Sequence, residues 1–411
     1  MLAYLYRYND IKQYFYLSNR GDLVIDRSLQ LEPGVYDIVL NNGHIQAQKL
    51  DMTIDEFIER VDFGSWQPLF EIPDGLRNHM LKFAKKLLKY KLENRFVLIR
   101  SHNDADGFGA AVGLNRIFPW SMKIIYPTPT YQLKDAISDI SLLMNKNNPV
   151  MILSDLGGNS ESQQALNLFK VHGIDYVVID HHPFQNPDPE HYLISWEYDS
   201  SGKYTATYLT NEIARILGYE HDEFIYIGLV GDKSPLIQHT EELRLKSMIV
   251  DFLTSYTNDF NFIYQVMTNP NLYQEYMNSA KEKYGEIGDL IRESYYMIIK
   301  GVKVYFIDAE KIIRRIEFQS TGKIASYILD IVGDNSVILV YNNNRYTIRI
   351  GEGAFAKGID THKIMNSVKE FILGGGHLRA ASFKFHGANR KMIESKIIET
   401  IRQVLNNENS G

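Results

Sequence analysis

Between residues 78 and 239, short runs rich in Ile, Val and Leu alternate with stretches that have a helical pattern. Strands that alternate with helices are typical of a parallel sheet covered by helices on both faces. The pattern therefore predicts an α/β domain with a parallel five-stranded sheet over residues 78–239. The predicted strands are 96–100, 122–126, 150–154, 176–179 and 192–195, and the later helices are 205–218 and 222–231.

The first 75 residues show a different pattern, in which turn dipeptides separate short β-type runs. Gly21-Asp22 precedes the run LVID, and Asn42-Gly43 joins VYDIVL to HIQAQKL. An Asn-Gly pair between two such runs is a strong hairpin signal. Residues 1–75 are therefore predicted to form a small β-rich module. We assign its aromatic residues to the core rather than to base stacking: Tyr4, Tyr6, Tyr8, Tyr14 and Tyr16.

A helical connector and a second domain are predicted after the parallel sheet. Residues 240–299 lack β-branched runs and are expected to be mostly helical, with a break at Asn269-Pro270. Residues 300–411 are expected to form a smaller mixed α/β domain. Its predicted strands are 302–307, 336–341, 345–350 and 381–385, and its predicted helices lie near 321–332, 360–372 and 390–406.

Length and composition narrow the possibilities further. The chain has 411 residues, a length that favours several domains over one hydrophobic core. Cysteine is absent, which excludes disulfides, thiolate zinc sites and iron–sulfur clusters, so any metal must be bound by oxygen and imidazole ligands. Because no apolar run approaches the roughly 18 residues of a membrane span, we expect a cytoplasmic protein without a membrane partner.

Charge is distributed unevenly along the chain. Residues 1–300 contain 28 Lys and Arg against 39 Asp and Glu, whereas residues 301–411 contain 16 against 11. The two parts therefore carry net charges of −11 and +5. Because local charge steers charged ligands more than the total does, the last hundred residues are candidates for contact with a polyanion. The acidic part is a candidate for binding cations.

Histidines and aspartates follow the predicted strands at the points where parallel strands end. HNDADG follows the first strand, an isolated aspartate the third and DHH the fourth, and a later helix ends in Gly-Asp. Ligands of open parallel sheets bind at the carboxyl ends of the strands. Four separate segments should therefore bring one set of side chains to one edge of the sheet: His102, Asp104, Asp106, Asp155, Asp180, His181, His182 and Asp232.

Each of these residues has a simpler explanation when it is taken alone. A single aspartate at a strand end is usually a helix N-cap, a His-His pair is often incidental, and Gly107 or Gly157-Gly158 would form tight turns. Carboxylates crowded together, however, repel one another unless cations balance their charge. The set therefore predicts a site for two divalent ions, with Asp155 as a bridging ligand. Carboxylate and imidazole ligands favour manganese, magnesium or iron.

Taken in order along the chain, HNDADG, the isolated aspartate, DHH and the final aspartate resemble the four motifs of the DHH phosphoesterases. The sequence GGGH at residues 374–377 and Arg349 resemble the signature and the phosphate-binding arginine of the DHH-associated C-terminal domain. The resemblance covers residues 78–400, and within the superfamily the chain looks most like the archaeal RecJ-like single-strand nucleases. It implies the fold already expected from the pattern of strands and helices.

The resemblance also implies cofactors and ligands. Two manganese ions, with magnesium as an alternative, would be bound by residues that also serve catalysis. The implied ligands are His102 and Asp104 for the first ion, Asp106, His181 and Asp232 for the second, and Asp155 as the bridge between them.

Further roles follow from the same resemblance. Asp180 would orient His181 through the N–H of its ring, and His182 would contact the scissile phosphate or assist the leaving oxygen as a catalytic residue. The glycine-rich loop and the basic residues of the second domain would bind substrate phosphates. The implied substrate-binding residues are Arg349, Gly374, Gly375, Gly376, His377 and Arg379.

The implied activity is that of a metal-dependent exonuclease on single-stranded DNA or RNA, in DNA replication, repair or RNA turnover. One alternative is a small-substrate phosphoesterase that cleaves short oligoribonucleotides, phosphoadenosine phosphate or a cyclic dinucleotide. A second is a non-catalytic replisome scaffold, but none of the expected ligands is replaced by an apolar residue. Helicase or replisome proteins would be the expected protein partners.

Overall fold

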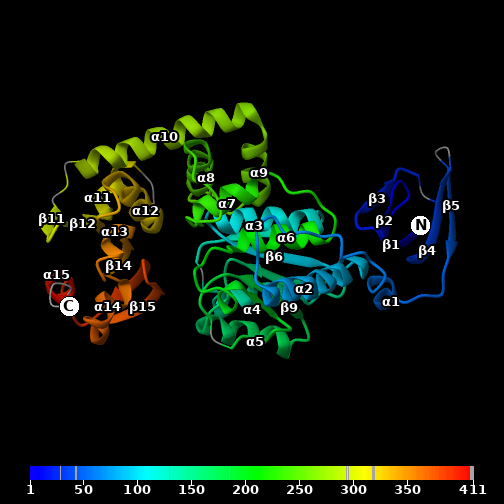
Figure 1. Ribbon diagram of the computed structural model, residues 1–411, viewed down its shortest axis with the longest axis horizontal. Coiled ribbons are helices and arrows are strands. Elements are labelled where there is room, and N and C mark those ends of the chain that lie inside the picture. Colours follow the sequence, from blue (N-terminus) through cyan, green and yellow to red (C-terminus); the bar gives the residue numbers. More distant parts are fainter. Residues whose placement is uncertain are drawn as a thin grey trace. The chain divides into compact units, whose positions relative to one another are not determined.

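The computed structural model describes residues 1–407 apart from residues 28, 42–43, 129, 185, 293, 295 and 317–319. The chain divides into two compact units, Met1–Asn269 and Pro270–Gly411. Three sheets confirm the predicted fold class: an antiparallel sheet near the N-terminus, a parallel five-stranded sheet, and a mixed sheet in the second unit (Figure 1). Among the described helices, none is long and apolar enough to cross a membrane.

The N-terminal module is a five-stranded antiparallel sheet with the strand order β3-β2-β1-β4-β5. The predicted hairpin is confirmed by the pairing of Asn41 with His44, while its turn at 42–43 lies outside the described residues. The strands are β1 (Leu2–Tyr8), β2 (Gln13–Leu17), β3 (Asp22–Ile25), β4 (Gly34–Asn41) and β5 (His44–Lys49).

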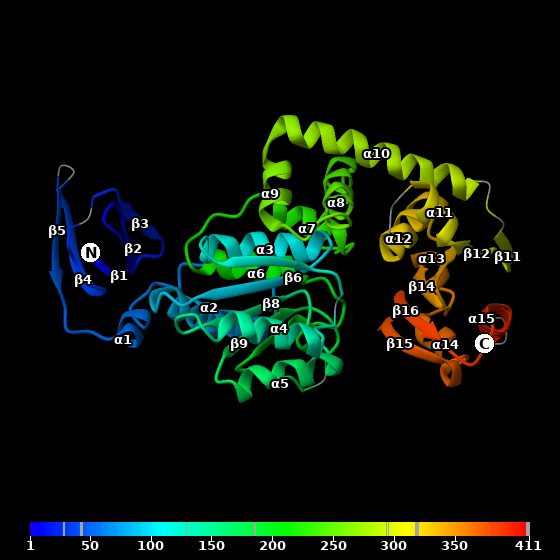
Figure 2. The same cartoon turned by 180° about the vertical axis from the view of Figure 1, so that it is seen from behind.

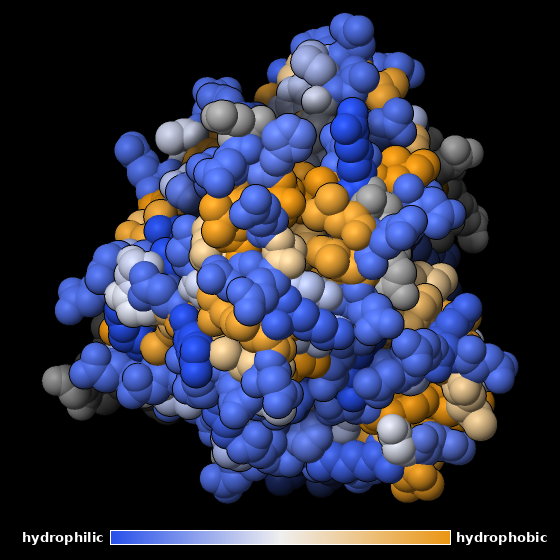
Figure 3. All heavy atoms as spheres, turned by 90° about the vertical axis from the view of Figure 1, so that its right-hand side faces the viewer, coloured by the Kyte–Doolittle hydropathy of each residue, from blue (hydrophilic) through white to orange (hydrophobic). Residues whose placement is uncertain are grey.

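The two faces of this sheet have different partners. Ala3, Leu5 and Phe15 belong to a small apolar cluster of the module itself. Tyr4, Tyr6 and Tyr16 lie on the opposite face and pack into the large core that the module shares with the helices of the parallel sheet, as their assignment to a core predicts. The side chain of Tyr8 lies outside the described part of the chain. Figure 3 looks at the side of the molecule on which the module lies in Figure 1 and shows apolar side chains among mostly hydrophilic ones.

The central sheet has the strand order β10-β9-β8-β6-β7, and every pair is parallel. Its strands begin and end within two residues of the predicted positions. They are β6 (Val97–His102), β7 (Met122–Tyr126), β8 (Val150–Ser154), β9 (Asp175–Asp180) and β10 (Tyr192–Ile194). Because all five strands point the same way, the polar residues at their carboxyl ends lie along one edge.

Helices cover both faces of this sheet (Figures 1 and 2). Along β8, Val150 and Ile152 face one helical layer and Met151 and Leu153 the other, as the alternation of side chains in a strand requires. The first layer contains α2 (Asp74–Leu92), α3 (Ala105–Ile117), α6 (Ala206–Ile216) and α7 (Phe224–Gly231), and the second contains α4 (Leu133–Leu143) and α5 (Gln163–Val171). The remaining helices of this unit are α1 (Ile54–Ile58), α8 (Glu241–Thr254) and α9 (Phe260–Thr268).

The second unit is built on a six-stranded mixed sheet with the order β11-β12-β13-β14-β16-β15. Its strands are β11 (Tyr296–Ile299), β12 (Val302–Asp308), β13 (Ser336–Asn342), β14 (Arg345–Ile350), β15 (Ile372–His377) and β16 (Ala380–Phe385). Its helices are α10 (Pro270–Arg292), α11 (Ala309–Ile316), α12 (Thr321–Val332), α13 (Glu352–Phe355), α14 (Thr361–Asn366) and α15 (Arg390–Asn407).

Three predictions for this part of the chain were wrong. The glycines at 374–376 lie in the edge strand β15, not in a loop, and the preceding helix ends at Asn366 instead of continuing to 372. Glycine is a weak strand former, but here pairing with β16 decides the conformation. β11 was also missed, because its four residues YMII follow a long helix and pair only with the next strand through the turn at Lys300-Gly301.

Candidate metal centre

The first motif forms the turn between β6 and α3. Asp104 is the N-cap of α3, and its Oδ1 accepts a hydrogen bond from Gly107 N at 2.9 Å. Position 107 admits only glycine, because a Cβ atom would lie 2.3 Å from the carbonyl oxygen of His102. The second oxygen of Asp104 lies 2.6 Å from Nδ1 of His102. Burial raises the pKa of Asp104, but the charge and hydrogen bond of His102 outweigh burial and hold the pKa below its usual range.

Asp155, directly after β8, has a backbone φ of +58°, in the left-handed region that side chains other than glycine rarely adopt. Its N–H donates to Ile179 O at 3.0 Å and so extends the pairing of β8 with β9. Aspartate tolerates this conformation better than most residues, and such backbone geometry is concentrated at functional sites. The turn brings Oδ2 of Asp155 to 3.5 Å from His102 Nδ1 and Oδ1 to 3.3 Å from His181 Nε2.

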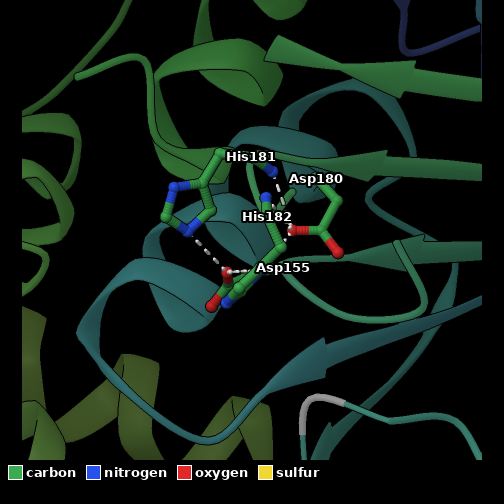
Figure 4. Close-up of side chains that lie close together, drawn as sticks. All are labelled: Asp155, Asp180, His181 and His182. Carbon is green, nitrogen blue, oxygen red and sulfur yellow. Dashed lines mark hydrogen bonds and ion pairs between the residues drawn. The ribbon is translucent and has the colours of Figure 1, made fainter. Parts of the chain in front are cut away.

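Asp180 ends β9 and holds the two histidines that follow it (Figure 4). Its Oδ1 accepts hydrogen bonds from the backbone N–H of His181 at 2.7 Å and from Nδ1 of His182 at 2.6 Å, while Oδ2 accepts one from Gly158 N at 2.9 Å. The expected bond from Asp180 to the ring of His181 is therefore replaced by a bond to the ring of His182. Burial raises the pKa of Asp180, but the charge of His182 holds it below its usual range.

Asp106 is buried and lies against the first turn of α6. Its Oδ2 accepts a hydrogen bond from Ala206 N at 2.9 Å, and its Oδ1 accepts one from Thr207 N at 3.0 Å. The first N–H groups of a helix have no partner within the helix and carry partial positive charge, so they hold a carboxylate well. Both oxygens of Asp106 are thus fixed by a segment a hundred residues away in the sequence.

The eight residues expected at the strand ends all come together at this edge of the sheet. His181 Nε2 lies 3.0 Å from Asp232 Oδ2 and 3.8 Å from Asp106 Oδ2. Among the residues that the structure describes, ligand-type atoms gather within 4.8 Å of one another in three overlapping groups. They are His102 with Asp104 and Asp155; Asp106 with His181 and Asp232; and Asp155 with Asp180, His181 and His182.

Electrostatics in this cluster favour added positive charge. Burial raises the pKa of Asp106 well above its usual value, and the charges of Asp155 and Asp232 act in the same direction. Burial also raises the pKa of Asp155, with a contribution from the charge of Asp104. Burial lowers the pKa of His181, but Asp232 and Asp155 more than compensate and raise it well above the usual value. Acids that retain protons in this way also favour metal cations, which supply the same charge.

Two atoms of the cluster are buried without a hydrogen-bond partner in the described chain, Asp155 Oδ1 and His181 Nε2. Buried polar atoms are almost always hydrogen-bonded, whereas these two have ion-pair contacts without hydrogen-bond geometry, including His181 Nε2 with Asp232 Oδ2 at 3.0 Å. They lie 3.3 Å apart, and both belong to the groups of ligand atoms described above. A divalent ion with oxygen and nitrogen ligands would satisfy both, and a set without sulfur suits manganese or magnesium. The residues therefore fit the ions that the sequence implies.

The structure adds supporting residues that the motifs did not reveal. Asp251 of α8 accepts a hydrogen bond from Ala105 N at 3.1 Å, and Thr254 donates from Oγ1 to Asn103 O at 2.7 Å. Both hold the turn that carries the first motif. An acidic residue between apolar neighbours was the one available signal, in the run SMIVDFLTS. The role of Thr207 had no sequence signal at all.

The substrate-binding residues expected in the second unit lie in and beside its sheet. Arg349 of β14 donates from Nε to Ser326 Oγ and from Nη1 to Ile348 O, both at 3.0 Å. Arg379 forms an ion pair with Glu352 and donates to Ile350 O. The side chain of His377 lies outside the described part of the chain. Gly374, Gly375 and Gly376 form the middle of the edge strand β15.

Comparison with known proteins finds a family match for the segment that carries most of this site. Residues 96–229 match the DHH family, N-terminal domain. A curated protein of Methanocaldococcus jannaschii, named only as uncharacterized, is 22% identical over 455 residues, which is 87% of this chain and 59% of that protein. The chain thus spans about three fifths of the length of the curated relative it matches.

Two solved structures share the fold. The DHH domain of a protein described as a member of a family of ribosomal proteins has a TM-score of 0.72 and 22% identity, covering 80% of this chain and 92% of its own. Exonuclease RecJ bound to manganese has a TM-score of 0.53 and 12% identity, covering 82% of this chain and 96% of its own. Identities this low establish a common fold, and the manganese belongs to the RecJ structure.

Proposed function

We propose that this chain, whose residues 96–229 form a DHH-family phosphoesterase domain, is a metal-dependent exonuclease of single-stranded nucleic acid. The observation that carries the proposal is Asp155, whose two carboxylate oxygens face two separate groups of histidine and aspartate. A carboxylate shared in this way is what a pair of ions in phosphoryl chemistry requires. The fold shared with exonuclease RecJ and the net charge of +5 over residues 301–411 support nucleic acid as the substrate.

Two of the three groups would each hold one divalent ion: His102 with Asp104 and Asp155, and Asp106 with His181 and Asp232. Bound there, the ions would act as Lewis acids that stabilise negative charge on the phosphate oxygens in the transition state. The protein contributes rigidity to this arrangement. Asp106 is fixed by the N-terminus of α6, Asp104 by the turn at Gly107, and Asp155 by its pairing with β9.

His182 is the residue we assign to the substrate side of the site. Its Nδ1 is held by Asp180 at 2.6 Å, which fixes the orientation of the ring. Nε2 is then the ring atom that contacts a phosphate oxygen or gives a proton to the leaving oxygen. Asp180 is thereby a positioning residue for His182, because its own oxygens are occupied by three backbone N–H groups and the ring.

End-labelled substrates test the proposal. Purified protein with Mn2+ should shorten single-stranded oligonucleotides of DNA or RNA stepwise from one end, and time courses with 5′-labelled and 3′-labelled strands identify that end. The matched control is Asp106→Ala, which should be inactive under the same conditions. Hydrolysis of dinucleotides, phosphoadenosine phosphate or a cyclic dinucleotide, with longer strands left intact, would replace the nuclease with a small-substrate phosphoesterase. No hydrolysis of any phosphoester would contradict the proposal altogether.

A further inference from the structure

Helix α6 connects the metal centre with the N-terminal module. Its first two N–H groups hold Asp106, as described above. At its other end, Tyr16 donates from its hydroxyl group to Leu217 O at 2.8 Å, and Arg20 donates from Nη1 to Ile216 O at 3.3 Å. The module thus binds the carbonyl groups at the C-terminus of the helix, where an arginine is also favoured by the helix dipole. Helix α6 therefore contacts Asp106 at its N-terminal end and the module at its C-terminal end.

The module is held against this end of the helix by close packing and a buried charge. Lys91 of α2 is completely buried, and its Nζ lies 2.9 Å from Asp22 Oδ2 on β3 of the module. The rings of Tyr6, Trp120 and Tyr219 surround the same ammonium group, with centroids 4.9, 5.2 and 5.0 Å away. Removing Asp22 would leave the buried ammonium group of Lys91 without its carboxylate partner, which is strongly unfavourable. The docked position of the module is therefore well determined.

Helix α6 has little room to move independently of its neighbours. Every residue from Ala206 to Ala214 is buried. A Cβ atom on Gly109 of α3 would lie 2.5 Å from Thr207 Oγ1, and one on Gly228 of α7 would lie 2.2 Å from the same atom. The helix is therefore enclosed by α3 and α7 without spare volume. Because tightly packed interiors transmit displacement instead of absorbing it, a shift at one end of α6 should reach the other.

We propose that the N-terminal module, residues 1–50, positions a metal ligand: by binding the C-terminal end of α6, it holds the first turn of that helix and with it Asp106. The inference rests on the proposed function, because it concerns the ion of the group Asp106, His181 and Asp232. Tyr16 and Arg20 are positioning residues in this scheme. A module with only a structural role would raise the stability of the fold and leave the affinity for metal ions unchanged.

Metal binding by full-length variants tests the inference. Tyr16→Phe and Arg20→Ala, singly and together, remove the hydrogen bonds to the C-terminal end of α6 and keep the apolar packing of the module. Titration of the metal-free protein with Mn2+, followed by calorimetry or electron paramagnetic resonance, should show one of two binding events weakened by roughly three- to tenfold. The matched controls are Tyr36→Phe, which loses a hydroxyl group bonded within the module to Glu32 O, and Arg27→Ala at an exposed position. Both controls should bind Mn2+ like the wild type.

A second comparison assigns the effect to Asp106. In an Asp106→Ala background, Tyr16→Phe with Arg20→Ala should change the affinity of the remaining ion by less than twofold, because the residue through which they act is gone. Three results would overturn the inference. They are an equal loss of affinity for both ions, the same loss of Mn2+ affinity in the Asp106→Ala background as in the wild type, and a lower melting temperature with unaltered Mn2+ binding. Failure of the wild type to bind Mn2+ at all would instead contradict the proposed function, and this inference with it.

Discussion

At the scale of single residues, the metal centre depends on side chains whose backbone or hydrogen bonds leave them one orientation. Asp155 illustrates this, because its left-handed backbone turns a buried carboxylate back between His102 and His181. Asparagine tolerates the same conformation, so the charge of this residue can be removed without changing its backbone. Shape and charge can therefore be separated experimentally at this position.

Asp155→Asn should fold normally and lose its hydrolytic activity. Because a carboxylate shared by two ions, as proposed, would balance the charge of both, we expect kcat with Mn2+ to fall by at least about 100-fold. Steady-state kinetics measure the fall in kcat, and Mn2+ titration measures the affinity for the ions, with the exposed Asp51→Asn as the control. Activity within a fewfold of the wild type would show that Asp155 does not bridge the ions.

Asp180 and His182 should act as one unit. His182→Ala is expected to reduce kcat by roughly 100-fold or more with Mn2+ affinity unchanged, since proton transfer and phosphate contact contribute on this scale. Asp180→Asn should reduce kcat less, and the double variant should lose no more than His182→Ala alone, because Asp180 acts through that ring. A further loss in the double variant, together with weaker Mn2+ binding, would return Asp180 to the role of orienting His181.

At the scale of elements, glycines decide how closely segments approach one another. In β15, a Cβ atom on Gly374 would lie 2.3 Å from Ser382 O, and one on Gly376 would lie 2.3 Å from Ala380 O. Gly375, between them, has no neighbouring atom within 4 Å of that position. A side chain at position 375 would therefore enter open space, whereas side chains at positions 374 and 376 would overlap with β16.

Alanine substitutions in β15 should reveal this difference. Gly374→Ala is expected to lower the free energy of unfolding by about 1–3 kcal/mol, because the added methyl group overlaps the partner strand. Gly375→Ala is the matched control, and it should be neutral or stabilise the protein by up to about 1 kcal/mol by restricting the unfolded chain. Chemical denaturation of both variants measures the difference. Equal destabilisation would mean that β15 does not pair with β16 in this register.

At the scale of the whole molecule, the metal centre lies entirely within the first compact unit. All eight clustered residues fall between His102 and Asp232, and the second unit has a hydrophobic core of its own. A ligand that binds only folded protein stabilises the part to which it binds. Metal binding should therefore affect the two units differently.

Calorimetry should show two unfolding transitions, and only one should depend on metal. Mn2+ is expected to raise the melting temperature of the unit Met1–Asn269 in proportion to the logarithm of its concentration, and EDTA should reverse the shift. Asp106→Ala should reduce this shift without affecting the second transition. A single transition, or an equal shift of both, would show that the two units unfold together.

The elements of the central domain and the residues of the candidate site could be predicted from the amino-acid sequence. Runs of Ile, Val and Leu located the five parallel strands to within two residues, because a buried strand is recognisable from its own side chains. The direction of those strands then required that His102, Asp155 and His181 meet at one edge. Local patterns sufficed for the strands, and the common direction of parallel strands sufficed for the meeting of the distant residues at their ends.

The contacts that hold the candidate site in place became visible in the folded chain alone. Four contacts could not be predicted from the sequence. They are the hydrogen bond of Asp180 to the ring of His182, the hydrogen bonds of α6 to Asp106, the pairing of Gly374–Gly376 with β16, and the hydrogen bond of Tyr16 to Leu217. Most of these contacts join residues far apart in the chain, and the choice between two adjacent histidine rings depends on how the turn after β9 packs. They arise from close packing between elements, and neither the hydrophobic periodicity nor a short motif predicts how two elements pack.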